Sequence, residues 1–158
     1  MQNATAPAPT LPAILSEIAE HPFLRGLEQK HLAILADCAM RCRFEAGECI
    51  FREGEPANRF YLIRSGKVAL ETATERGTNT LQLIGGQDVL GWSWLYPPYY
   101  WHFDARAIEK TDAIFIYGTR LREICEEDHD LGYELMKRTA STLISRLVAA
   151  RRDLAAKS

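Results

Sequence analysis

The hydrophobic period of this sequence changes twice, and those two changes constrain its fold more than any other feature. Apolar residues recur every three or four positions over residues 11–20 and 29–39, which predicts two short amphipathic helices. From residue 40 the period becomes two, and turn signals interrupt it at intervals of about 8–12 residues. From residue 119 the helical period returns. Many short strands between helices predict an antiparallel barrel or sandwich with flanking helices.

The period-two region predicts about eight strands. They are expected at residues 40–44, 48–52, 60–64, 67–72, 78–84, 88–90, 103–109 and 112–117. Two pairs that contain glycine, Ser65-Gly66 and Arg76-Gly77, are the expected hairpin turns.

The longest helical pattern runs from residue 131 to about residue 155 and carries two apolar stripes. Asp128 or Asp130 can cap its first turn. One stripe can pack on the barrel and the other on a second copy of the chain, so this pattern predicts a homodimer through residues 131–154. The residues of these stripes are Leu135, Met136, Thr139, Leu143, Ile144, Leu147, Val148, Ala150 and Leu154.

Length and charge narrow the function classes. The 158 residues suggest one domain, expected at residues 11–158 after a disordered lead-in over residues 1–10, with the barrel at about 40–118 and helices at 119–156. Nineteen basic against 21 acidic side chains give a net charge of −2, so no bulk field attracts nucleic acid. No apolar run is long enough to span a membrane, and no secretory signal opens the chain. A cytoplasmic protein is therefore expected.

The stretch from residue 85 to 107, GGQDVLGWSWLYPPYYWHFDARA, is the segment most indicative of function. Glycine before a short turn lets backbone N–H groups converge on an anion, and two prolines then stiffen the chain. Aromatic side chains in such a loop either fill the core or cover a ligand, a partner subunit or the sheet beneath. These side chains are Trp92, Trp94, Tyr96, Tyr99, Tyr100 and Trp101.

The segment FEAGECIFREGEPANRFYLIRSGKVAL, residues 44–70, resembles the first half of a known domain. This is the cyclic-nucleotide-binding domain of the catabolite activator/FNR regulators, protein-kinase regulatory subunits and cyclic-nucleotide-gated channels. Gly47, Gly54 and Gly66 fall where that family has turn glycines, and the resemblance extends over residues 23–153. It implies a β-roll jelly-roll barrel of the α+β type, a phosphate-binding cassette between two strands, and a final helix that dimerises.

The cassette of this chain departs from the pattern that it resembles. The family's glutamate, which holds the ribose hydroxyl, corresponds to Trp92 after the retained Gly91, and its phosphate-pairing arginine corresponds to Trp101 or His102. An indole ring cannot neutralise a phosphate. The resemblance therefore implies a regulatory module, and these departures favour a nucleotide-like or aromatic effector other than cAMP or cGMP. The candidate ligand-binding residues are Gly91, Trp92, Ser93, Trp94, Leu95, Tyr100, Trp101, His102, Arg106 and Arg151.

Arg106 and Arg151 are the nearest cationic candidates for a replacement anion contact. Arg106 alternatively pairs with Asp104, which lies two residues away on the same face of the expected strand. Arg151 alternatively lies in solvent at the end of the long helix.

The resemblance also bears on DNA binding. Transcription factors of that family carry a helix-turn-helix domain after the dimerisation helix, whereas this sequence ends at Ser158. Direct DNA binding is therefore not expected, and the chain resembles a sensor half that acts through a partner protein.

The sequence contains no recognisable catalytic motif and no standard metal-ligand spacing. The histidines lie in no catalytic motif, although His102 and Asp104 could form a titrating pair or a structural hydrogen bond. Cys38, Cys42 and Cys49 are either three ligands of a metal or redox site or buried thiols. No phosphate loop or nucleophile elbow occurs, so a non-enzymatic protein is expected.

Three alternatives to a sensor of a non-standard ligand remain open. The chain could be a protein-interaction module in which Trp92 or Trp101 fills the pocket. It could be a genuine cAMP or cGMP regulator that acts with a separate output protein. It could also be a redox or metal sensor that uses its cysteines.

Overall fold

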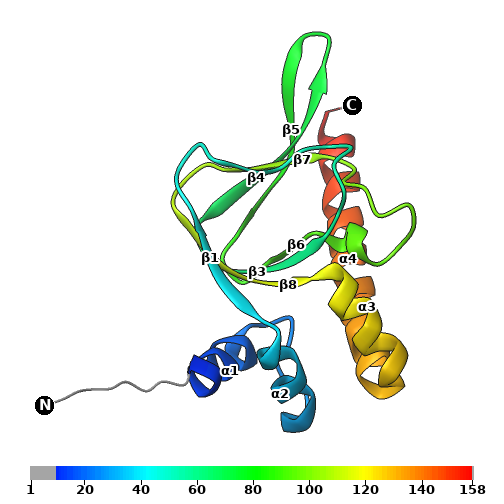
Figure 1. Cartoon of the computed structure of the whole chain (residues 1–158). Coiled ribbons are helices and arrows are strands. Elements are labelled where there is room, and N and C mark those ends of the chain that lie inside the picture. Colours follow the sequence, from blue (N-terminus) through cyan, green and yellow to red (C-terminus); the bar gives the residue numbers. More distant parts are fainter. Residues whose placement is uncertain (1–9, 158) are drawn as a thin grey trace, which may run out of the picture.

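Two four-stranded antiparallel sheets face each other and form a barrel, as the computed structural model of the chain shows for the described residues, 10–157 (Figure 1). The expected lead-in lies outside these residues, except that Thr10 begins the first helix. One sheet has the order β1-β8-β3-β6 and comprises Met40–Phe44, Thr111–Tyr117, Arg59–Ser65 and Val89–Leu90. The other has the order β2-β7-β4-β5 and comprises Cys49–Phe51, Asp104–Ala107, Lys67–Thr74 and Gly77–Gly85. The predicted jelly-roll barrel of eight strands is therefore confirmed.

The interior of the barrel follows directly from the period of two. Alternate side chains of a strand point to the same face, so β3 and β4 each send apolar residues into the barrel. Ile63, Val68 and Ala105 are fully enclosed there, together with Phe115 from β8. Burial of this apolar area is the main force that holds the two sheets together.

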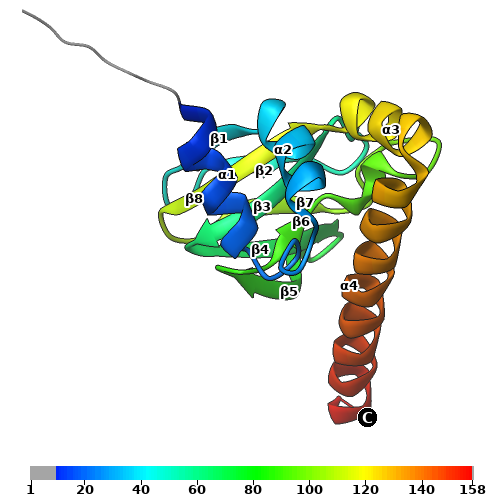
Figure 2. The same cartoon turned by 90° about the horizontal axis from the view of Figure 1, so that it is seen from below.

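A second core lies between the outer face of the first sheet and the helices. The helices α1 (Thr10–Glu20) and α2 (Gln29–Asp37) cover this sheet, and α3 (Gly118–Glu127) follows β8 directly (Figure 2). Their apolar faces meet the outward side chains of β3 and β8 at Leu62 and Ile114. The helix predicted at 29–39 corresponds to α2, which ends at Asp37, two residues earlier than predicted.

The helix α4 (His129–Ala156) begins in this second core and then runs alongside the barrel. The side chain of Asp128 accepts a hydrogen bond from the backbone N of Leu131 at 3.1 Å, which confirms Asp128 as the cap. Leu131 and Leu135 are buried, whereas apolar side chains from Leu143 onward are largely exposed. No helix within residues 10–157 is long and apolar enough to cross a membrane.

The two expected hairpins have different outcomes. Arg76-Gly77 does join β4 to β5, whose residues pair from Thr74 and Gly77 onward, so this hairpin is confirmed. The prediction of a hairpin at Ser65-Gly66 is wrong, because β3 and β4 belong to different sheets. Gly66, with a φ of 107°, takes the chain from one sheet to the other.

Candidate functional site

The cassette between β6 and β7 begins at Gly91, which no other residue could replace without strain. Its φ of 101° lies in the left-handed region. A Cβ at this position would lie 2.8 Å from the carbonyl oxygen of Arg59 and 2.9 Å from the ring of Trp101. Glycine therefore lets the short helix η1 (Trp92–Trp94) start close against the barrel.

Trp101 belongs to the core of the barrel. Its ring stacks on Phe51 with centroids 3.7 Å apart and an interplanar angle of 8°, and only 4% of the residue is exposed. Its backbone N donates to the carbonyl of Glu55 and its carbonyl accepts from the N of Gly54. One of the two positions that the resemblance assigns to the phosphate-pairing arginine is thus occupied by a core indole.

Trp94 and its neighbours lie in the other core. Trp94 is fully buried and packs on Phe60, Ser93 is buried beside it, and Leu95 packs against the same core. Arg122 of α3 donates to the carbonyl oxygen of Trp94 at 2.7 Å. Its guanidinium also lies 4.0 Å from the ring centre of Tyr99, so α3 holds the cassette through a cation–π contact as well.

Trp92 is half-buried and lines an open groove between the barrel and α4. The groove has a volume of about 710 Å³. Side chains from β4, the cassette and α4 form its apolar walls, and polar side chains of β5 and of the end of α4 lie at its rim. The walls include Leu70, Trp92, Phe103, Leu143 and Leu147, and the rim includes Asn79, Asp153 and Lys157.

The remaining candidates are spread over the surface. Tyr100 is about half exposed, and His102 is exposed with its ring edge-on to Trp92 at 5.2 Å. His102 and Asp104 form no hydrogen bond within residues 10–157. Arg151 is exposed on α4 and does not line the groove.

Arg106 has a different partner from the one expected. The pairing with Asp104 is wrong: Arg106 donates to both carboxylate oxygens of Glu71, at 3.1 and 2.6 Å. This hydrogen bonding raises the pKa of Arg106. Asp104 instead accepts a hydrogen bond from the backbone N of Glu53 at 2.7 Å. Because β4 lies beside β7, the cross-strand carboxylate is closer than the one on the same strand.

Arg146 lines the groove but is not among the ligand-binding residues that the sequence predicts. It lines the groove from α4, and its Nη2 donates to the carbonyl oxygen of Val89. Burial lowers its pKa. Helical spacing contains the signal that could have found it, because Arg146 follows Leu143 by three positions and precedes Ala150 by four, which places all three on one face.

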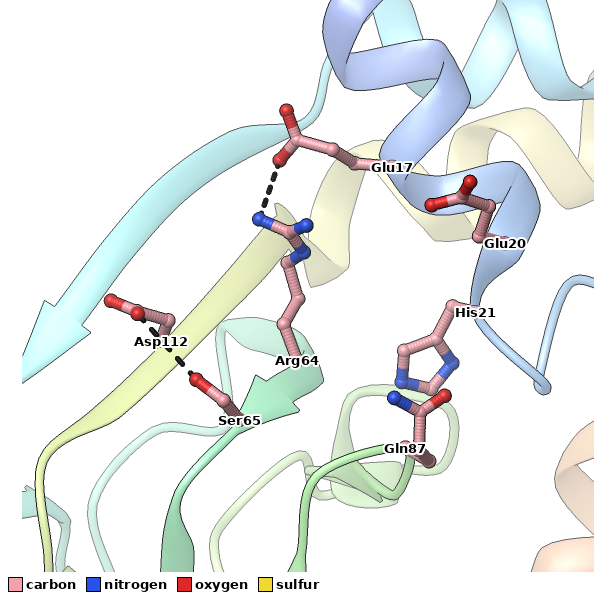
Figure 3. Close-up of a pocket in the computed structure, with 7 residues that line it drawn as sticks. All are labelled: Glu17, Glu20, His21, Arg64, Ser65, Gln87 and Asp112. Atoms are coloured by element: carbon pink, nitrogen blue, oxygen red, sulfur yellow. Dashed lines mark hydrogen bonds and ion pairs between the residues drawn. The ribbon is translucent and has the colours of Figure 1, made fainter.

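A separate polar hollow of about 280 Å³ lies where α1 meets the barrel (Figure 3). The carboxylate of Glu17 lies 2.9 Å from Arg64 and also binds Arg41, and Ser65 donates to Asp112 at 3.5 Å. These charges neutralise one another, so the hollow serves to attach α1 to the barrel.

His21, at the edge of this hollow, fastens the end of α1. Its Nε2 contacts the carbonyl oxygens of Ile63 and Asp88, and its Nδ1 accepts from the backbone N of Phe23 at 3.2 Å. Those partners require the neutral ring with its proton on Nε2. Burial accordingly lowers the pKa of His21 below its ordinary value of 6.5.

We expect this ring to make stability depend on pH. As pH falls past 6.5, the unfolded chain binds a proton at His21 and the folded chain does not. The contribution of the neutral His21 ring to the free energy of unfolding is therefore complete above pH 6.5 and is lost as the pH falls below it. Between about pH 7.5 and about pH 5.5, urea unfolding of the wild type should show a larger decrease in unfolding free energy than that of His21→Gln. The exposed His129→Gln serves as the control, and a wild-type decrease no larger than that of His21→Gln would contradict the assignment.

The structure does not bring the cysteines together. Cys38 donates its thiol proton to carbonyls of α2, and Cys49 does the same to Phe51. Burial raises the pKa of Cys42 to about 11, so this thiol stays protonated and unreactive at neutral pH. Within residues 10–157, no group of three or more histidine, cysteine and acidic side chains could hold a metal ion.

Comparisons with known proteins point to one family. The family model described as "Cyclic nucleotide-binding domain" matches residues 41–128. A CRP-like cAMP-activated global transcriptional regulator of Mycobacterium tuberculosis is 27% identical over 127 residues. The match covers 80% of this chain and 57% of the regulator, so the chain spans little more than half the length of that relative.

Solved structures give the same result. A cyclic nucleotide-binding protein from Geobacter metallireducens is similar with a TM-score of 0.76 at 28% identity, and the match covers 84% of this chain and 96% of that one. A cyclic nucleotide-binding domain from Methylobacillus flagellatus has a TM-score of 0.79 at 16% identity, with 94% and 84% covered, and supports the fold alone.

Proposed function

The chain belongs to the cyclic nucleotide-binding domain family, and on that premise we propose that it is a non-enzymatic sensor module for a ligand other than cAMP or cGMP. The ligand binds in the groove between the barrel and α4. Its binding changes how α4 packs, and α4 passes the signal to a second copy of the chain or to a partner protein.

The position of Trp101 is the observation that carries this proposal. A cyclic phosphate needs a cation at the cassette, and charge-assisted contacts to arginine are among the strongest that proteins offer. Trp101 instead stacks on Phe51 inside the barrel, and His102 is exposed. The nearby cation on β7, Arg106, is already paired with Glu71.

The groove supports a planar ligand. Trp92 and Phe103 offer aromatic surface beside the apolar face of α4. An aromatic side chain that stacks on a base contributes about 1–3 kcal/mol.

Exposed apolar side chains on α4 support a homodimer. Tyr133 and Ile144 are each more than half exposed and lie outside the groove, which is costly on a surface helix unless another surface covers them. They recur at helical spacing along one side, as in a two-helix seam. We therefore place the dimer contact on α4.

Native mass spectrometry of the protein purified from its own host tests the proposal. We expect a dimer that carries a small-molecule adduct whose mass is not that of cAMP or cGMP. A co-purified cyclic mononucleotide at one copy per chain would contradict the proposal.

A protein-interaction module without a small ligand is the second candidate function. The filling of the barrel by Trp101 favours it, as does Tyr96 on the same loop, which is 72% exposed. The same spectra distinguish the two functions, because an interaction module gives a dimer without adduct in which a partner protein is the only addition.

A further inference from the structure

Arg146 is a largely enclosed cation that has no carboxylate partner among residues 10–157. Six of the other thirteen arginines form ion pairs within the described residues, namely Arg41, Arg43, Arg64, Arg106, Arg120 and Arg138. Arg146 has one hydrogen bond from its Nη2 to the carbonyl of Val89, and its buried Nη1 has no partner. A buried charge without a partner is costly, which is why proteins pair such groups.

Asp88, the acid whose charge acts on Arg146, does not fill this role. The charge of Asp88 favours the protonated form of Arg146, but burial has the larger effect and the pKa of Arg146 is lowered. The Asp88 carboxylate accepts a hydrogen bond from the backbone N of Gly85 at 2.9 Å and forms no ion pair with Arg146. The guanidinium therefore keeps donor capacity for an acceptor that comes from outside the chain.

The position of Arg146 in the groove defines where such an acceptor would lie. Trp92 and Phe103 line the same groove with aromatic surface, and Leu143 and Leu147 continue the apolar wall on α4. Asp153 lies seven residues further along α4, or about 10 Å at 1.5 Å per residue, so a negative charge is disfavoured at that end. One anionic group at the Arg146 end and flat apolar rings along the walls match these properties.

We infer that the groove binds a flat aromatic molecule with a single anionic group, and that Arg146 is the counter-ion of that group. This inference rests on the proposed function, because it names the ligand class of the same groove. The inference assigns recognition of the ligand's charge to α4, the helix that also carries the proposed dimer contact. Ligand binding would therefore act directly on the helix that forms the dimer.

Two fluorescent probes that differ in charge test this inference. 1-Anilinonaphthalene-8-sulfonate is aromatic and anionic, and N-phenyl-1-naphthylamine has the same rings without the sulfonate. We expect the wild type to bind both, and Arg146→Met to weaken the anionic probe about tenfold or more while the neutral probe changes less than about twofold. Trp92→Ala should weaken both probes, because both sit in the groove.

Matched variants control for charge and for folding. Arg146→Lys keeps a cation and should retain most of the affinity for the anionic probe. Arg151→Met removes an exposed arginine of the same helix and should change neither affinity. Each variant is checked for a cooperative thermal transition, since loosely packed proteins bind such dyes unspecifically. Should Arg146→Met fail to fold, the wild type still decides, since it must bind the anionic probe more tightly than the neutral one.

The outcomes separate the inference from the proposed function. If Arg146→Met binds the anionic probe as tightly as the wild type while Trp92→Ala weakens both probes, the groove binds ligands but Arg146 is not the counter-ion, and only the inference fails. If Trp92→Ala changes neither affinity, the probes bind elsewhere and the inference also fails. A cyclic mononucleotide in the native mass spectrum would overturn the proposed function itself.

Discussion

Replacement of Trp101 by alanine is expected to lower the free energy of unfolding by about 3–5 kcal/mol, the usual cost of removing a large aromatic side chain from a core. The indole stacks on Phe51 inside the barrel, so its removal leaves a cavity in this core. Urea unfolding measures the change. Both proteins are compared at one chain concentration, because the stability of a dimer depends on it.

Tyr96→Ala is the matched control for this prediction. Tyr96 is an aromatic residue of the same loop but is 72% exposed, so its removal should change the unfolding free energy by less than about 0.5 kcal/mol. A Trp101→Ala variant as stable as Tyr96→Ala would contradict the placement of Trp101 in the core of the barrel.

Gly66→Ala has the second large effect that we expect. A Cβ at Gly66 would lie 2.4 Å from the Oγ1 and 2.6 Å from the Cα of Thr111, and the φ of 107° disfavours any side chain. We expect a loss of about 2–5 kcal/mol in unfolding free energy, the sum of about 1–3 for overpacking and about 1–2 for the backbone. The measurement is again urea unfolding.

Gly54→Ala separates the two contributions. Gly54 has a φ of 89°, but nothing lies within 4 Å of its ideal Cβ, so only the backbone cost of about 1–2 kcal/mol should remain. Equal losses at the two glycines would contradict the close approach of Gly66 to β8.

Most of the fold could be predicted because each element has a local cause. The period of two and the turn signals mark most of the strands, and the caps and breaks of the helices are local as well, as Asp128 shows. The turn at Gly66 could not be predicted in this way. A glycine between two strands looks the same whether those strands pair with each other or with strands that are distant in the sequence.

The candidate site was less accessible to sequence reasoning. The cassette could be located from its glycine and its resemblance, but which aromatic faces which core depends on how the loop folds back. Trp92, Trp94 and Trp101 are close in sequence and have three different environments. The pairing of Arg106 with Glu71 depends on the neighbouring strand, and the role of Arg146 depends on the path of α4 past the barrel.

We propose that this member of the cyclic nucleotide-binding domain family pairs no cation with a cyclic phosphate at its cassette. Isothermal titration of the purified protein with cAMP and with cGMP tests it most directly. We expect no saturable heat at nucleotide concentrations up to about 1 mM, which corresponds to a binding free energy weaker than about −4 kcal/mol. Saturable binding of either nucleotide in the micromolar range would contradict the claim.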